Sequence, residues 1–303
     1  MILSVSRRTD IPALYNDWFL DRIKEGFILT ANPFFPNGKV AKIIIEPVRV
    51  TENLLGGKEI TGNVEGIVFW TKNPEPMFKR LDELGEFKYY FHFTLNPYDE
   101  NIELNVPPLV ERIEIFKELS KRIGANRVIW RYDPILLSKE HDVAWHIKQM
   151  ESMAKQLNGY TKSCMTSFLI PGKNKSIWTP NASQQDELLK NFARITQENG
   201  IQLHTCALKD DWSKYGIKKA QCTDPELFSQ LNGGKLKTKR KDGTRKHCGC
   251  MPCVDVGVYN TCTHDCAYCY ANGFYGYRGE PKSMLDKLNG EIYDRKTERL
   301  FEY

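Results

Sequence analysis

One pattern repeats along the first two thirds of the chain: a short apolar stretch, a polar group at its end, and then an amphipathic stretch. Helices are predicted between the apolar stretches, near residues 13–26, 75–84, 107–123, 140–157 and 183–199. The apolar stretches predict strands at Ile2–Ser6, Gly66–Trp70, Tyr89–Thr94, Arg127–Arg131, Ser163–Leu169 and Gln202–Cys206. Strands that alternate with helices pair in parallel through right-handed crossovers. The pattern therefore predicts an α/β fold, with residues 40–50 as an extended excursion from the main sheet.

Charged and amide residues follow several of these predicted strands. They include Asp10 after the first strand, Lys72 after the second, and Asn96 after the third. In barrel-like α/β sheets the chemistry lies at the carboxyl ends of the strands. We therefore expect these side chains to share one rim, although ordinary turns favour the same residue types.

Composition limits the class of protein. The chain has 303 residues, of which 41% are hydrophobic, so it can bury a large core. No apolar run reaches the roughly 18 residues that a membrane span needs, and the amino terminus lacks the features of a signal peptide. Six of the nine cysteines lie between positions 248 and 269, which in a reducing compartment favours metal binding. We expect a cytoplasmic protein without membrane contacts.

The net charge of +5 is concentrated in residues 235–246, which hold seven basic residues and one acidic residue. The rest of the chain is nearly balanced. Such a run can contact the phosphates of a nucleic acid, and it can equally be a solvated loop.

The sequence near the carboxyl terminus, Cys262-Thr-His-Asp-Cys266-Ala-Tyr268-Cys269, places three cysteines at C-x3-C-x2-C spacing. A cubane [4Fe–4S] cluster takes four thiolates, so three leave one iron open to a further ligand. Structural zinc loops usually combine a C-x2-C pair with a second such pair or with two histidines. The triplet therefore predicts an iron–sulfur site in preference to zinc.

This spacing, with an aromatic residue before the third cysteine, resembles the signature of the radical S-adenosylmethionine (radical SAM) superfamily. The resemblance implies that the open iron chelates the amino and carboxylate groups of S-adenosylmethionine, which is then cleaved reductively to a 5′-deoxyadenosyl radical that abstracts hydrogen from a substrate. It also implies an electron donor such as a flavodoxin or ferredoxin. It further implies cofactor contacts for Asp10 (ammonium), Lys72 or Arg131 (carboxylate), Asn96 (ribose) and Tyr268.

The order of the elements is unusual for that superfamily, where the cysteine loop follows the first strand near the amino terminus. Here a predicted strand at Val254–Tyr259 leads into the loop near the carboxyl terminus. We therefore predict a partial (β/α)6 TIM-like barrel that is circularly permuted, within a single domain over residues 1–303. Residues 1–206 supply the second and later strands, 207–253 an insertion, and 254–303 the cluster strand, its loop, and a charged helix and tail.

The chain also resembles an uncharacterised bacterial family that carries a radical-SAM-like cysteine cluster at its carboxyl terminus. A more distant likeness is to spore photoproduct lyase, whose relatives carry Thr-Asp-Pro and Thr-Lys-Ser after successive strands. Thr9-Asp10-Ile-Pro12 and Thr71-Lys72-Asn73 are similar to those motifs. Short motifs of this kind indicate fold and not substrate.

The remaining cysteines suggest a second site. We predict that Cys206, Cys222, Cys248 and Cys250 hold an auxiliary [4Fe–4S] cluster or a structural zinc, or stay plain thiols. Cys253 is left over, and Cys164 is expected in the core.

The function predicted from the sequence is therefore a radical SAM enzyme whose substrate is open among a DNA photoproduct, a peptide and a small metabolite. The alternatives are a zinc-stabilised nucleic-acid-binding module and a repair enzyme like the photoproduct lyases.

Overall fold

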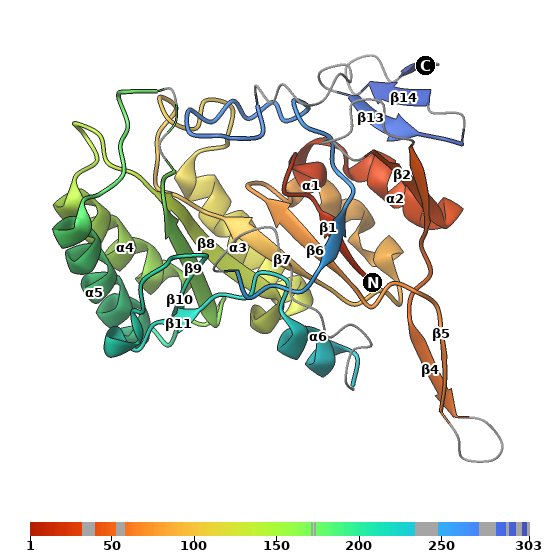
Figure 1. Ribbon diagram of the computed structural model, residues 1–303, viewed down its shortest axis with the longest axis horizontal. Helices are drawn as coiled ribbons and strands as arrows, with labels where there is room; N and C mark the ends of the chain where they lie inside the picture. Colours follow the sequence, from red (N-terminus) through yellow and green to blue (C-terminus); the bar gives the residue numbers. More distant parts are fainter. Residues whose placement is uncertain are drawn as a thin grey trace.

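The protein is described by a computed structural model that covers residues 1–31, 40–52, 58–170, 172, 174–233, 248–272, 283–288, 291–294 and 299–301. Its centre is an eight-stranded sheet in the order β11-β10-β9-β8-β7-β6-β1-β12, with every neighbouring pair parallel (Figure 1). The strands are β1 (Ile2–Val5), β6 (Gly66–Thr71), β7 (Tyr89–Thr94), β8 (Val128–Ile135), β9 (Ser163–Phe168), β10 (Gln202–Thr205), β11 (Lys218–Lys219) and β12 (Cys253–Asp255). The predicted α/β fold with a parallel sheet is confirmed.

Helices cover one face of this sheet. They are α1 (Ile11–Leu14), α2 (Asn16–Glu25), α3 (Leu109–Ile123), α4 (Val143–Leu157) and α5 (Ala182–Glu198), with the 3₁₀ helices η1 (Glu75–Leu84), η2 (Ala125–Arg127) and η3 (Ser213–Tyr215). Alternate strand residues such as Leu3, Phe69 and Trp130 face them in the main hydrophobic core. Cys164 on β9 lies in this core as expected.

The opposite face of the sheet is covered by the segment that follows β10. Phe228 of α6 (Pro225–Leu231) packs there with Val68, Tyr90 and Met165. A Cβ atom on Gly66 would lie only 1.9 Å from Cε1 of Phe228, so the ring fits because position 66 is glycine. This covered face holds the side chains that point away from the helices, and the candidate site lies at the carboxyl ends of its strands.

The carboxyl-terminal strand β12 pairs in parallel with the amino-terminal strand β1, with Ser4 opposite Asp255. The Asp255 carboxylate accepts hydrogen bonds from Ser4 Oγ (2.7 Å) and Ser6 Oγ (2.6 Å). The strand is shorter than the predicted Val254–Tyr259, because the Gly257 N–H turns back to Asp255 Oδ1 and leaves the ladder. The expected neighbourhood of the two ends of the chain is confirmed.

Three small antiparallel sheets lie outside the central one: β2 (Phe27–Thr30) with β3 (Ala41–Ile44), β4 (Arg49–Glu52) with β5 (Lys58–Thr61), and β13 (Ser283–Asp286), β14 (Glu291–Asp294) and β15 (Arg299–Phe301) together. The β4–β5 hairpin projects from the body (Figure 1). Residues 40–50 therefore leave the main sheet, as predicted. Among the described residues, none of the helices has both the length and the apolar character needed to cross a membrane.

The prediction of a carboxyl-terminal helix is wrong, because the described residues there form the antiparallel sheet of β13, β14 and β15. Trp18 Nε1 donates to the Leu285 carbonyl at 2.9 Å, and Arg22 pairs with Asp286 at 2.8 Å. Burial of Met284, Leu285 and Ile292 outweighs the helical tendency that the charged residues suggested.

Candidate functional site

A cavity of about 490 Å³ lies at the carboxyl ends of the central strands. Its wall includes Asp10, which follows β1, Lys72, which follows β6, and Arg131 and Asp133 from β8. Asp10 and Lys72 therefore share one rim as expected, whereas Asn96 does not line the cavity. Seven of the nine cysteines also line this cavity: Cys206, Cys222, Cys248, Cys250, Cys262, Cys266 and Cys269.

The three cysteines of the C-x3-C-x2-C loop are half-buried and close enough to influence one another electrostatically. The Cys269 N–H donates to the Cys266 carbonyl at 3.0 Å, and the Ala271 N–H donates to Cys269 Sγ at 3.4 Å. Burial raises the pKa of Cys262 and of Cys266 to about 12. These two thiols therefore stay protonated at neutral pH unless a metal binds, even though Lys72 lies near Cys266.

The segment after β7 holds this loop in place. The Ala267 N–H donates to the Ile102 carbonyl at 2.8 Å, and the Asn105 N–H donates to the His264 carbonyl at 3.0 Å. Glu103 and Cys266 form an isolated antiparallel bridge between these two hydrogen bonds. No local sequence signal marked residues 102–105 as a docking surface, because their partners lie more than 150 positions away in the chain.

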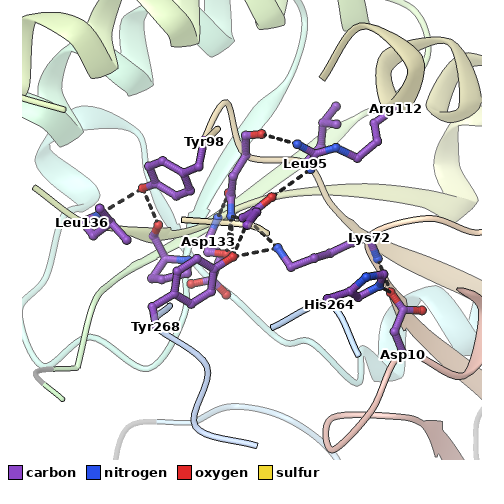
Figure 2. A network of polar contacts seen from close by, with 12 residues as sticks. Asp10, Lys72, Leu95, Tyr98, Arg112, Asp133, Leu136, His264 and Tyr268 are labelled. Atoms are coloured by element: carbon purple, nitrogen blue, oxygen red, sulfur yellow. Dashed lines mark hydrogen bonds and ion pairs between the residues drawn. The ribbon is translucent and has the colours of Figure 1, made fainter. Parts of the chain in front are cut away.

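Glu103 is the centre of a buried polar network. Its partners Lys72, Arg112 and Tyr268 are labelled in Figure 2. Its carboxylate accepts from Lys72 Nζ at 2.6 Å, from Arg112 at 3.1 Å and from the Tyr268 hydroxyl. Burial alone would raise the pKa of Glu103, but Lys72 and Arg112 outweigh it and hold that pKa below its usual value. Burial lowers the pKa of Lys72, but Glu103 and Cys266 together outweigh this effect and raise that pKa above its usual value. Both groups are charged, and Tyr268 joins the cysteine loop to them.

Asn96, which was predicted to contact a ribose, is fully buried. Its Nδ2 donates to Glu103 (3.0 Å), Tyr268 (3.1 Å) and the Asp133 carbonyl (3.0 Å). Its Oδ1 accepts from the Asp133 N–H at 2.8 Å. All of these partners belong to the protein, so Asn96 stabilises the residues of the cavity wall without lining the cavity itself. The ribose contact stays a prediction.

Asp10 joins three parts of the site (Figure 2). Oδ1 caps helix α1 by accepting from the Ala13 N–H, whereas Oδ2 accepts from the Lys72 N–H at 2.7 Å. His264 Nε2 lies 2.9 Å from the same Oδ2, and His264 Nδ1 lies 3.1 Å from the Asn105 carbonyl. His264, which the sequence suggested to be only a loop residue, is buried and connects the cysteine loop to Asp10.

The second predicted cysteine group is brought together. Cys206 Sγ lies 3.5 Å from Cys222 Sγ, and Cys222 and Cys248 both contact Cys250. Arg131 Nη1 donates to Cys222 Sγ at 3.2 Å and pairs with Asp133. The contact with Cys222 lowers the pKa of Cys250 to about 5 and that of Cys206 to about 7.

In the described parts of the chain, no three His, Cys, Asp or Glu side chains lie close enough together, in their present conformations, to hold a metal ion. The basic segment 235–246, with its predicted nucleic-acid contact, lies outside the described residues. Cys253, predicted to be spare, accepts from Arg7 Nη2 at 3.2 Å and does not line the cavity.

Comparison with known proteins gives a family and no activity. The model of the family described as "Domain of unknown function (DUF1848)" matches residues 2–271, which span the whole central sheet and the cysteine loop. No curated protein matches the chain.

Proposed function

The chain belongs to the DUF1848 family, and we propose that it is a radical SAM enzyme that holds a [4Fe–4S] cluster through Cys262, Cys266 and Cys269. The observation that carries the proposal is that all three thiols line one cavity together with paired charges from the strand ends. When bound, the cluster supplies the electron that cleaves S-adenosylmethionine to a 5′-deoxyadenosyl radical.

The donor set fits such a cluster. Three thiols from one loop leave one of four irons without a protein ligand. Burial keeps Cys262 and Cys266 protonated, so they become thiolates only when a positively charged partner binds. The Lys72 ammonium interacts electrostatically with Cys266, and the Ala271 N–H donates to Cys269 Sγ. Both contacts stabilise negative charge on sulfur.

The cavity also suits S-adenosylmethionine, an amino acid that carries a nucleoside with a flat aromatic base. Its volume of about 490 Å³ lies within the usual range of ligand pockets. Lys72 and Arg131 place cations in the wall, Asp10 and Asp133 place carboxylates there, and Trp70, Phe168 and Leu169 supply apolar surface. Opposite charges at fixed positions would orient the ammonium and carboxylate of a methionine moiety. The roles predicted for Asp10, Lys72, Arg131 and Tyr268 are retained on this basis.

The order of the strands supports a permuted barrel. β12, which leads into the cysteine loop, is followed in space by β1, β6, β7, β8, β9 and β10. Apart from β12, these strands occur in that same order along the chain. We propose that β12 is the first strand of a partial (β/α)6 barrel and that the permutation moved it to the end of the chain. Adjacent parallel strands require proximity in space and not in sequence, so packing allows this.

The proposal is tested with the full-length chain, purified and reconstituted without oxygen. We expect about four irons and four sulfides per chain at the loop, and 5′-deoxyadenosine on addition of dithionite and S-adenosylmethionine. Cys266→Ala should abolish cofactor cleavage, and Cys253→Ala, which leaves the triplet intact, should retain it. A reducible cluster that never cleaves the cofactor would contradict the enzymatic proposal. A colourless protein in which this loop binds zinc and no sulfide would contradict the cluster itself.

A further inference from the structure

The four cysteines that the loop does not use meet from three separate places in the chain. Cys206 directly follows β10, Cys222 lies three residues before α6, and Cys248 and Cys250 precede β12. From this convergence we propose that Cys206, Cys222, Cys248 and Cys250 bind a single tetrahedral metal ion of the zinc class. This site is independent of the cluster at Cys262, Cys266 and Cys269.

The distance between the sulfurs favours one ion over a second cubane. Two thiolates on one zinc stand about 3.8 Å apart, because each lies about 2.3 Å from a tetrahedral metal. Cys206 Sγ and Cys222 Sγ are 3.5 Å apart, and the Cys222 N–H lies 3.1 Å from Cys250 Sγ. The Cys250 thiol in turn interacts electrostatically with Cys248. In a cubane each thiolate binds its own iron, which holds the ligand sulfurs farther from one another.

The backbone already holds the segments together. The Met251 N–H donates to the Thr223 carbonyl at 3.0 Å, and Thr223 Oγ1 donates to the Met251 carbonyl at 2.6 Å. These two bonds fix Cys222 beside Cys250. The Cys206 N–H donates to the Thr166 carbonyl at 2.8 Å, which fixes the third segment to β9.

Donors next to the sulfurs suit a thiolate site. The Cys222 N–H donates to Cys250 Sγ at 3.1 Å, and Arg131 Nη1 donates to Cys222 Sγ at 3.2 Å. Arg131 is buried, so its positive charge offsets part of the negative charge that four thiolates around a divalent ion leave. Binding releases the thiol protons and needs no oxidant or reductant. The ion would link the segment that packs on the covered face of the sheet to the end of β10.

The test removes the loop cysteines first. The full-length Cys262→Ala/Cys266→Ala/Cys269→Ala variant is purified without oxygen and analysed for zinc, iron and acid-labile sulfide. We expect about one zinc per chain, retained through gel filtration, without sulfide. Iron with sulfide in this variant would overturn the single-ion proposal in favour of a second cluster. Absence of bound metal, or a disulfide between Cys206 and Cys222 in its place, would also overturn it.

Single substitutions in that same variant then assign the ligands. Cys222→Ser should lower the zinc content at least tenfold, whereas Cys253→Ser, at a cysteine outside the four, should retain it. Equal loss from both substitutions would overturn the assignment. If Cys222→Ser does not fold, zinc is exchanged for cobalt in the variant that lacks only the three loop cysteines, and the cobalt spectrum tests the ligand set. A tetrathiolate site gives the visible spectrum of tetrahedral cobalt with thiolate charge transfer, and its absence would overturn the proposal.

Discussion

The ammonium of Lys72 lies 2.6 Å from the carboxylate of Glu103, at the point where both meet the hydroxyl of Tyr268 from the cysteine loop. Arg112 pairs with the same carboxylate at 3.1 Å, and the side chains of Glu103 and Arg112 are each only 1% exposed. Burying charges is costly unless each has a partner, so removing one member leaves the others uncompensated. This buried network therefore determines where the cysteine loop sits.

Glu103→Gln should lower the free energy of unfolding by about 3–5 kcal/mol, because it leaves Lys72 and Arg112 as buried cations without a counter-charge. Urea denaturation at neutral pH measures the change. Glu114→Gln is the matched control, since Glu114 pairs with Lys117 on the exposed surface of α3 and should cost less than about 0.5 kcal/mol. Similar losses from both substitutions would contradict the buried network.

Asp10 and His264 should be energetically coupled. Asp10→Asn keeps a good cap for helix α1 but loses the charge that His264 contacts at 2.9 Å. We expect a double-mutant cycle of Asp10→Asn and His264→Ala to give a coupling of about 1–3 kcal/mol in unfolding free energy. Strict additivity of the two substitutions would show that the cysteine loop is not fastened through this pair.

Gly66→Ala should destabilise the fold by about 3 kcal/mol, because the added methyl group overlaps the ring of Phe228 on the covered face of the sheet. Phe228→Leu in the same chain should recover part of the loss. Gly172→Ala is the control, since a Cβ there meets no atom within 4 Å, and thermal unfolding compares the variants. A Gly66→Ala protein as stable as the control would mean that α6 does not pack against β6.

His146 should make the fold sensitive to acid. Its Nε2 donates to the Leu136 carbonyl (2.6 Å) and its Nδ1 accepts from the Tyr132 hydroxyl (2.7 Å), so the neutral ring is the one that fits. Burial lowers the pKa of His146 to about 4, against 6.5 for the ordinary side chain. Between these pH values the unfolded chain binds more protons than the folded one, so stability rises with pH.

This contribution is complete above pH 6.5 and is lost as the pH falls towards about 4, amounting to at most about 3 kcal/mol. Urea unfolding at several pH values in this window measures how the free energy of unfolding depends on pH. This dependence should be shallower for His146→Gln than for the wild type, and the difference in slope should correspond to at most about one bound proton. Parallel pH profiles for the two proteins would exclude His146 as the source. Carboxylates that titrate in the same window affect both proteins equally and cancel in the difference.

Much of the fold follows from local patterns. The nearly continuous burial along β1, β6 and β7 corresponds to apolar runs of neighbouring residues. The helices begin and end at local signals such as the Asp142 cap of α4. The C-x3-C-x2-C loop and the polar strand ends are also visible locally. The carboxyl-terminal sheet could not be predicted from local patterns, because β13 is held by contacts with Trp18 and Arg22, more than 260 positions away in the chain.

The sequence by itself determined which groups the site can use: three cysteines in one loop, four more around an insertion, and charges at the strand ends. Only the tertiary structure decided their partners. Glu103 carries no local signal, yet it meets Lys72, Arg112 and Tyr268 because β7 and the cysteine loop converge in space. Likewise, Cys206, Cys222 and Cys250 meet because the chain after β10 folds back over the sheet. The reason is physical: a hydrogen bond or an ion pair depends on distance in space, which local propensities do not contain.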